Sequence, residues 1–93
     1  MIFRHQTTAS FWEHYNRLPE ELRERADKQF ALLNENPRHP SIQLKPVGEF
    51  WSARVSDDYR VLALREGAIF TWFWIGPHNE YGRLISERNR GTA

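Results

Sequence analysis

Four side chains that can handle a phosphate lie in the second half of the chain, near the ends of strand-like runs: Arg54, Arg60, His78 and Tyr81. A guanidinium group suits anionic oxygens. An imidazole changes charge near neutral pH, so it can take or give a proton. A phenol is a poorer base, but it can donate a hydrogen bond or stack on a base. On pattern alone an alternative stays open, in which Arg60 snorkels over a sheet, His78 caps a helix and Tyr81 packs against it.

Three strand-like runs must position these side chains, at residues 50–55, 59–64 and 68–75. The third run is apolar on both faces, which is typical of a central strand covered on each side. Gly67 supplies the positive φ that a two-residue hairpin loop at Glu66-Gly67 needs. With that loop, Leu64 of the second run faces Ile69 of the third.

The same register places the end of the third run beside the start of the second. Counting outward, Arg60 faces Phe73, so the chain leaves the sheet close to Arg60. At about 3.3 Å per strand residue, His78 and Tyr81 are predicted within roughly 10 to 15 Å of Arg60. A basic residue, an imidazole and a phenol would then converge at one end of the sheet.

The turn between the first two runs decides whether Arg54 and Arg60 share a face. A two-residue loop at 57–58 sets the two arginines on opposite faces, whereas a three-residue loop at 56–58 sets them directly across from each other. Both geometries fit the sequence.

The first half of the chain predicts a strand, two helices and a connection, at residues 1–7, 9–17, 19–34 and 38–48. The helical segments carry apolar residues at helical spacing, and Leu18-Pro19 breaks them apart. The expected fold is α+β. It has an N-terminal strand, an antiparallel two-helix hairpin on a mainly antiparallel sheet of about four strands, and a short C-terminal helix bearing Arg83 and Arg88. Residues 1–93 form one domain, with 89–93 as a flexible tail.

Composition narrows the class of protein. The chain has no cysteine, so a disulfide framework and a thiolate metal site are excluded and a reducing cytoplasm is the expected setting. No apolar run approaches the roughly 20 residues of a membrane span. The four histidines have no ligand spacing, so we expect neither a metal nor another cofactor. Arginine supplies seven of the eight Lys and Arg residues in positions 37–93, but the net charge is only +1.

Two sequence segments carry a family resemblance. The order strand, helix, helix, strands, with WSARVSDDYRVL followed by IGPHNEY, resembles the RelE/ParE superfamily of bacterial toxins from type II toxin–antitoxin pairs. The resemblance extends from FWEHYNRLP and NENPRHPS through Tyr81. It implies a RelE-like fold that is similar to microbial ribonucleases. For the RelE branch it implies a metal-independent mRNA endoribonuclease, or mRNA interferase, that cuts messages in the ribosomal A site and inhibits translation.

The resemblance also assigns roles to individual residues. The catalytic positions fall on Arg54, Arg60, His78 and Tyr81, whereas a lysine that RelE has in the first of these strands is Ser52 here. Lys45 and Arg83 are further candidates for substrate binding. For RNA cleavage a 2′-hydroxyl must lose a proton while a 5′-oxygen gains one, and the arginines would hold the charged phosphorane between those steps.

The implied partners are a cognate antitoxin, mRNA and the ribosome. Exposed apolar residues on the first two helices, or the sheet edge at residues 1–4, would receive the antitoxin. The alternative is a binding module without chemistry, either a ParE-like gyrase inhibitor or an inactive relative that only binds an antitoxin. His78 and Tyr81 argue against the gyrase inhibitor, since ParE-like members lack this set.

Overall fold

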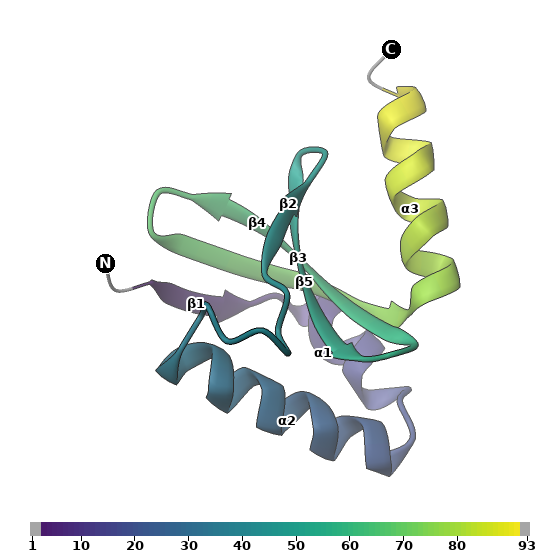
Figure 1. The fold of residues 1–93 in the computed structure, drawn as a ribbon. Helices are drawn as coiled ribbons and strands as arrows, with labels where there is room; N and C mark the ends of the chain where they lie inside the picture. The colour runs from purple at the N-terminus through teal and green to yellow at the C-terminus, as the bar shows by residue number, and fades with distance from the viewer. Residues whose placement is uncertain (1–2, 92–93) are drawn as a thin grey trace.

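Five strands and three helices make up the structure, a computed structural model that describes residues 3–91 and, of these, the side chains of residues 3–86 (Figure 1). In chain order the elements are β1 (Arg4–Thr7), α1 (Ala9–Asn16), α2 (Glu20–Glu35), β2 (Lys45–Val47), β3 (Phe50–Ser56), β4 (Tyr59–Glu66), β5 (Ile69–Pro77) and α3 (His78–Gly91). The predicted α+β class and the order of the predicted elements are confirmed.

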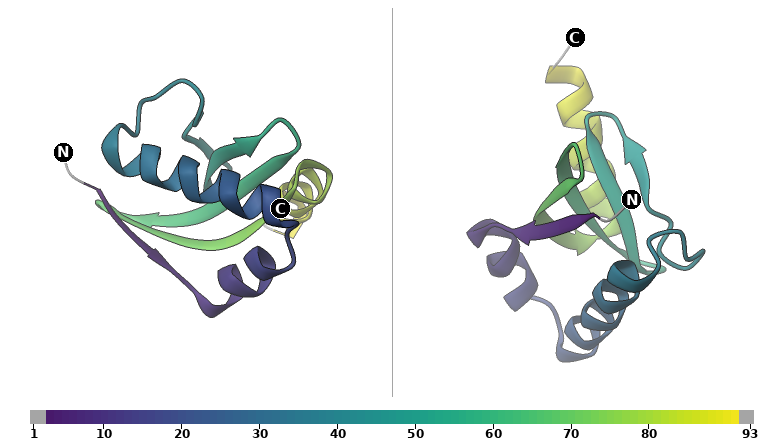
Figure 2. Two further views of the ribbon diagram at one scale, coloured as in Figure 1. Left: turned by 90° about the horizontal axis from the view of Figure 1, so that it is seen from below. Right: turned by 90° about the vertical axis from the view of Figure 1, so that its left-hand side faces the viewer.

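The strands form one twisted sheet in the order β1-β5-β4-β3-β2. β1 lies at one edge and runs parallel to β5, while the remaining neighbours are antiparallel. Helices α1 and α2 lie on one face of the sheet, and α3 leaves the end of β5 and extends away from the strands (Figures 1 and 2). β4 is thus the central strand, with β5 and β3 on either side of it.

Local signals explain where the first two helices begin. Thr8 has an extended backbone, and its side-chain oxygen accepts a hydrogen bond from the Phe11 N–H (3.1 Å), which caps α1. Pro19 occupies the capping position of α2 rather than its first turn. The phenol of Tyr15 donates to Asp27 Oδ1 (2.8 Å), which links α1 to α2.

The helix-covered face of the sheet holds most of the core. One cluster of buried residues joins α2, the following loop and the middle of the sheet: Leu33, Ile42, Ala53, Ala63, Phe70 and Trp72. A second cluster lies beneath the turn between the helices: Leu18, Ala26, Val55 and Ile75. We call this surface of the sheet the helix face.

The opposite surface, the α3 face, has a smaller core. Leu62 and Trp74 are buried there with Tyr81 of α3, and four partly buried residues pack around them: Phe50, Phe73, Leu84 and Ile85. Of α3, the first two turns reach this cluster. The predicted C-terminal helix is therefore present, and it begins at His78. It runs to Gly91, whereas the side chain of Arg88 and residues 92–93 of the predicted tail lie outside what the structure describes.

The segment 38–48, predicted as a connection, contains the short strand β2. Its residues pair antiparallel with β3, with Lys45 opposite Ser52 and Val47 opposite Phe50. Gly48, at φ +60°, forms the tight turn between the two strands. The sheet consequently has five strands, one more than the sequence indicated.

The predicted register of β4 and β5 is wrong by three residues at Arg60. The hairpin loop is Gly67-Ala68, so Glu66 faces Ile69, and an irregularity between Leu62 and Ala63 shifts the pairing again. Arg60 therefore faces Gly76 instead of Phe73. The correction moves Arg60 closer along the sheet to the point where α3 begins.

Candidate functional site

Arg54 and Arg60 face each other across β3 and β4. The turn between them is the two-residue loop 57–58, since Ser56 pairs with Tyr59, but the register shifts between Arg54 and Ser56. This β-bulge places one additional residue in β3, so Arg54 lies directly across from Arg60 even though the turn has only two residues. The two arginines consequently share the α3 face, which answers the question that the sequence left open.

Gly76 continues the row of the two arginines into β5, because it pairs with Arg60. A Cβ atom at this position would lie 2.6 Å from Cζ2 of Trp74. The absence of a side chain therefore lets the indole ring lie against the backbone of Gly76.

His78 is the first residue of α3 and follows the arginine row by two residues. Its backbone N–H donates to the carbonyl oxygen of Asp58 (2.6 Å), which ties the start of α3 to the β3–β4 turn. The side chain is exposed, and its ring lies 5.2 Å from that of Tyr81, centroid to centroid. An imidazole thus stands at the open end of the arginine row.

Tyr81 lies one helical turn after His78, and its side chain is almost entirely covered, with 9% of its surface exposed. It packs with Leu62 and Trp74. This burial suits a ring that holds His78 in place better than one that a substrate reaches over its whole face.

Both arginines already have protein partners at the turn. Arg54 forms an ion pair with Asp57, whose carboxylate is highly exposed. Nη1 of Arg60 donates to the carbonyl oxygens of Ser56 (2.6 Å), Asp57 (3.2 Å) and Tyr59 (3.0 Å). These bonds fix the Arg60 side chain through one nitrogen, so its Nε and Nη2 donors are not consumed by the turn.

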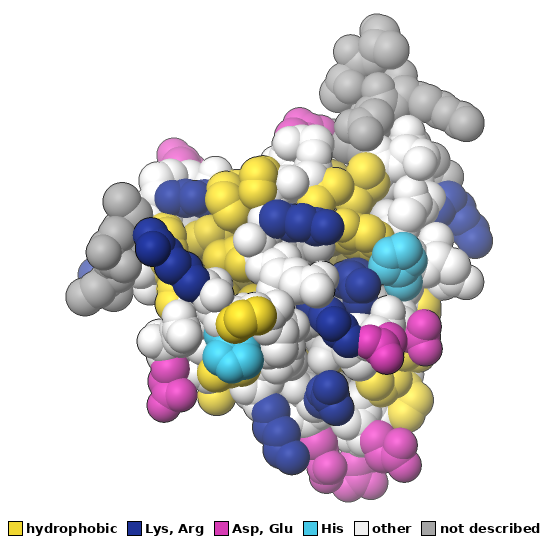
Figure 3. Space-filling view, in the orientation of Figure 1, with side chains coloured by type: hydrophobic (Ala, Val, Ile, Leu, Met, Phe, Trp, Pro, Cys, Tyr) yellow, Lys and Arg dark blue, Asp and Glu magenta, His cyan; other side chains and the backbone are white. Residues whose placement is uncertain are grey.

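The two substrate-binding candidates differ in their placement. Lys45 is exposed and faces Ser52, so its backbone position belongs to the row next to the arginines on the same face of the sheet. Arg83 is exposed on α3. Among the described residues, no hydrogen bond or ion pair joins Arg83 to the other candidates. Figure 3 shows basic side chains scattered over the side of the molecule seen in Figure 1, together with histidine side chains and with hydrophobic side chains between them.

Sequence reasoning missed Asp57 and Gly76 as parts of this site. Asp57 follows Arg54 by three residues, and an acidic pair in a turn beside an arginine is a signal that could have been used. Gly76 has no such signal, because its role depends on the ring position of Trp74.

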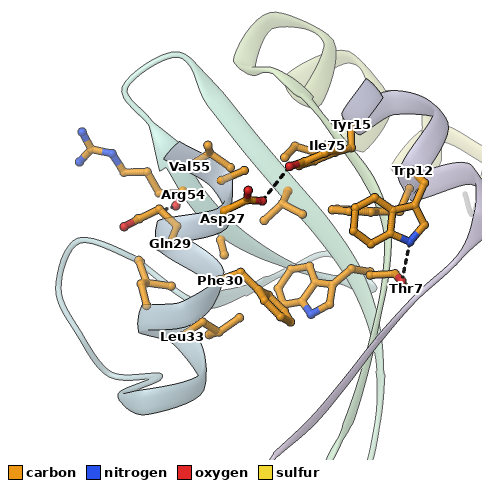
Figure 4. A pocket seen from close by; sticks show the side chains of 16 residues that line it. Thr7, Trp12, Tyr15, Asp27, Gln29, Phe30, Leu33, Arg54, Val55 and Ile75 are labelled. Carbon is orange, nitrogen blue, oxygen red and sulfur yellow. Dashed lines mark hydrogen bonds between the residues drawn. The ribbon is translucent and has the colours of Figure 1, made fainter. Parts of the chain in front are cut away.

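A separate apolar cleft of about 100 Å³ opens on the helix face, between α1, α2 and the sheet (Figure 4). Trp12 and Phe30 lie on either side of it and keep 46% and 43% of their surfaces exposed. The Trp12 indole N–H donates to Thr7 Oγ1 (2.9 Å) at the same place. The cleft is lined by aromatic and aliphatic groups and lies on the opposite side of the sheet from His78.

His5 is a titratable group that lies among aromatic rings on the helix face. Its Nδ1 atom accepts a hydrogen bond from the Trp72 indole N–H (3.1 Å), and rings of Phe30 and Phe70 lie within 6 Å. Burial lowers the pKa of this imidazole below its ordinary value. Burial, followed by the hydrogen bond to Asp27, raises the pKa of Tyr15. Both of these titratable groups lie on the helix face.

Among the described side chains of residues 3–86, the histidines and carboxylates form no group of three that could hold a metal ion. In the same part of the chain, no helix combines the length and apolar character required to cross a lipid bilayer.

The sheet order β1-β5-β4-β3-β2, with two helices on one face, is an arrangement that other solved proteins share. No family model and no curated protein matches the sequence. Solved structures do match. The RelB–RelE antitoxin–toxin complex of Methanococcus jannaschii is 12% identical, with a TM-score of 0.68 over 85% of this chain and 96% of that one.

Two further solved structures agree. Escherichia coli YafQ is 12% identical, with a TM-score of 0.64 over 85% of this chain and 97% of that one. The archaeal RelE–RelB complex of Pyrococcus horikoshii is 19% identical, with a TM-score of 0.60 over 83% and 96%. The chain therefore has the RelE/ParE-like toxin fold, and its structural neighbours are toxins of toxin–antitoxin pairs.

Proposed function

We propose that this protein is the toxin of a toxin–antitoxin pair and that it cleaves mRNA in the cytoplasm, on the ribosome, without a metal. The observation that supports the proposal best is the row Arg54, Arg60, Gly76 on one face of the sheet, followed two residues later by His78, whose ring lies against that of Tyr81 on the same face. Guanidinium and imidazole groups on one face are what acid–base cleavage of an RNA phosphodiester needs.

In this mechanism His78 moves protons and Arg60 stabilises charge. The exposed imidazole takes the proton of the attacking 2′-hydroxyl while water protonates the departing 5′-oxygen, or it protonates the 5′-oxygen while water accepts the proton of the 2′-hydroxyl, a contribution of about 10² to 10⁴ in rate. Arg60, fixed through Nη1 to the turn, directs its remaining donors at the negative oxygens of the phosphorane. Tyr81 acts through His78, since its own ring is almost covered.

Lys45 offers a replacement for the lysine that RelE has at the position of Ser52. The two residues face each other on neighbouring strands, so the Lys45 ammonium group extends from the same row of the sheet. Ser52 itself is 1% exposed and has no room for a long cation. In this proposal Lys45 binds RNA phosphate, and Arg83 extends the cationic surface along α3.

The proposed antitoxin docks on the helix face, where the cleft between α1 and α2 remains open. Trp12 and Phe30 are the exposed apolar anchors there, and large aromatic residues dominate the energetics of protein interfaces. The structural neighbours include antitoxin–toxin complexes, which supports a partner of this kind. The sheet edge at β1 adjoins the same surface.

The direct test is cleavage of a message by the purified protein in the presence of ribosomes. We expect cuts within codons, and we expect His78→Ala to reduce their rate by at least about a hundredfold while the circular dichroism spectrum is retained. His39→Ala, in the loop that follows α2, is the matched control and should cut normally. Unchanged cleavage by the His78 variant would remove this residue from the mechanism.

The second candidate is a binding module without chemistry. The observations that favour it are the pairing of Arg54 with Asp57 and the burial of Tyr81, which together leave His78 and Arg60 as the accessible members of the set. A gyrase inhibitor would block DNA supercoiling in vitro without cutting RNA. An inactive relative would do neither and would not slow growth on induction.

A further inference from the structure

The α3 face carries a pair of aromatic side chains near the row that contains Arg54 and Arg60. The rings of Phe50 and Phe73 lie 5.2 Å apart, centroid to centroid, at an interplanar angle of 57°. Phe50 begins β3 and Phe73 belongs to β5, so the two rings meet across the intervening strand β4. Both side chains are only partly buried.

The bulge in β5 explains why Phe73 belongs to this face. Ala63 pairs with Trp72 and Leu62 with Trp74, so Phe73 is the extra residue between them. Trp72 packs in the helix-face core, whereas Phe73 packs against the cluster around Leu62 on the α3 face. A regular strand would alternate the side chains, and the bulge instead puts two successive aromatic residues of β5, Phe73 and Trp74, on one side.

The aromatic pair and the arginines are aligned along β3. Phe50 precedes Arg54 by four residues, which is about 13 Å of strand. The row of Ser52, with Lys45 opposite it, lies between them. A path along this face thus meets guanidinium groups, then an ammonium group, then aromatic rings.

We propose that Phe50 and Phe73 form a stacking subsite for a nucleobase of the RNA, one or two nucleotides away from the bond that is cut. The inference rests on the proposed function and names the part of the substrate that this surface receives. Cationic groups that follow a phosphate backbone, with aromatic side chains for the bases, are the usual composition of a single-strand binding surface. The stacking partner can be any base, because every base has a π-face.

Charge favours RNA over an apolar partner helix on this surface. Lys45 is exposed next to the aromatic pair, and Arg60 follows one row further on. A purely apolar segment would have to cover these cations, which costs desolvation energy unless carboxylates accompany it. The phosphates of RNA supply the opposite charge at each nucleotide.

The experiment measures binding of a fluorescently labelled 2′-O-methyl hexanucleotide, which the protein cannot cleave because the attacking hydroxyl is blocked. The test variant carries Phe50→Leu and Phe73→Leu together, which keeps apolar packing but removes the aromatic faces. We expect its affinity to fall about tenfold at fixed salt concentration. Trp51→Leu, which removes an aromatic ring from the helix face, is the control and should bind like the wild type.

A set of oligonucleotides with one abasic position separates stacking from charge. At the nucleotide that stacks, removing the base should weaken wild-type binding about tenfold and leave the double variant unaffected. Equal affinities of the double variant and the wild type would overturn the subsite and would instead favour a protein partner on this surface. A wild type that binds no hexanucleotide, or that binds it with an insensitive aromatic pair, would contradict the subsite, whereas a lack of message cleavage in the presence of ribosomes would contradict the proposed function.

Discussion

The two faces of the sheet use similar side chains in different ways. On the helix face, Arg65 places its guanidinium carbon 4.9 to 5.2 Å from the ring centroids of Phe3, Trp51 and Phe70. On the α3 face, Arg60 of the same strand is held at a turn, beside an exposed His78. Arg65 thus packs within the core of the helix face, whereas Arg60 lies at the edge of the α3 face, at the β3–β4 turn. The comparison indicates that the α3 face is where side chains remain accessible for chemistry.

The aromatic residues of β5 allow the strongest test of this difference. Phe70 is fully buried on the helix face, so Phe70→Ala should lower the free energy of unfolding by about 3–5 kcal/mol. Phe73→Ala on the α3 face should cost about 1–2 kcal/mol, because its side chain is only partly covered. Urea denaturation of both variants measures the contrast, and equal losses would contradict the distinction between the faces.

The two arginines of β4 give the matching test for activity. Arg60→Gln should raise the activation free energy of message cleavage by about 3 kcal/mol, which slows cleavage by a factor of roughly a hundred or more. Arg65→Gln should leave cleavage unchanged and cost some stability through its lost cation–π contacts. The rates must be compared at temperatures where both variants are folded. A stronger cleavage defect in the Arg65 variant would reverse the assignment of the faces.

Two glycine substitutions compare the end of β5 on the α3 face with the helix α3 itself. Gly76→Ala should lower the free energy of unfolding by about 1–3 kcal/mol, because the new methyl group meets the Trp74 ring. Gly82→Ala in α3 has nothing within 4 Å of the new Cβ and should be neutral or stabilising by up to about 1 kcal/mol. Thermal unfolding of the pair is sufficient, and a destabilised Gly82 variant would argue against the helix as described.

The smallest expected effect concerns pH and the helix face. Because burial lowers the pKa of His5 in the folded state, the unfolded chain binds more protons below about pH 6.5, and stability should decline as the pH falls through that range. His5→Gln keeps an acceptor for the Trp72 indole and removes the titration. Its denaturation midpoint should therefore vary less between pH 7 and pH 5 than that of the wild type. A variant with the same acid dependence would assign the effect to other groups.

Hydrophobic periodicity was sufficient to predict the order of the elements and the α+β class, because the long runs of α2 and β5 have clear patterns. β2 escaped prediction because it has three residues, one of which is Pro46. The register could not be predicted, since bulges at Val55 and Phe73 depend on how the strands twist against their neighbours. Those two bulges decide that Arg54 and Arg60 share a face and that Phe73 joins them.

The sequence was sufficient to choose candidate site residues, but not to predict their contacts or their burial. His78, Arg54 and Arg60 could be chosen from the sequence because their residue types suit a phosphate and because they follow the strands. The ion pair of Arg54 with Asp57 and the burial of Tyr81 could not be chosen, since both depend on the packing of α3 and the turn.

The central claim is that the α3 face cuts RNA and that His78 does the proton transfer. The most direct measurement is the mapping of message ends in a bacterial host after induction of the wild type, His78→Ala and His39→Ala. We predict new ends within codons for the wild type and for His39→Ala, and none for His78→Ala. The same new ends in all three strains, or growth arrest without any new ends, would contradict the account.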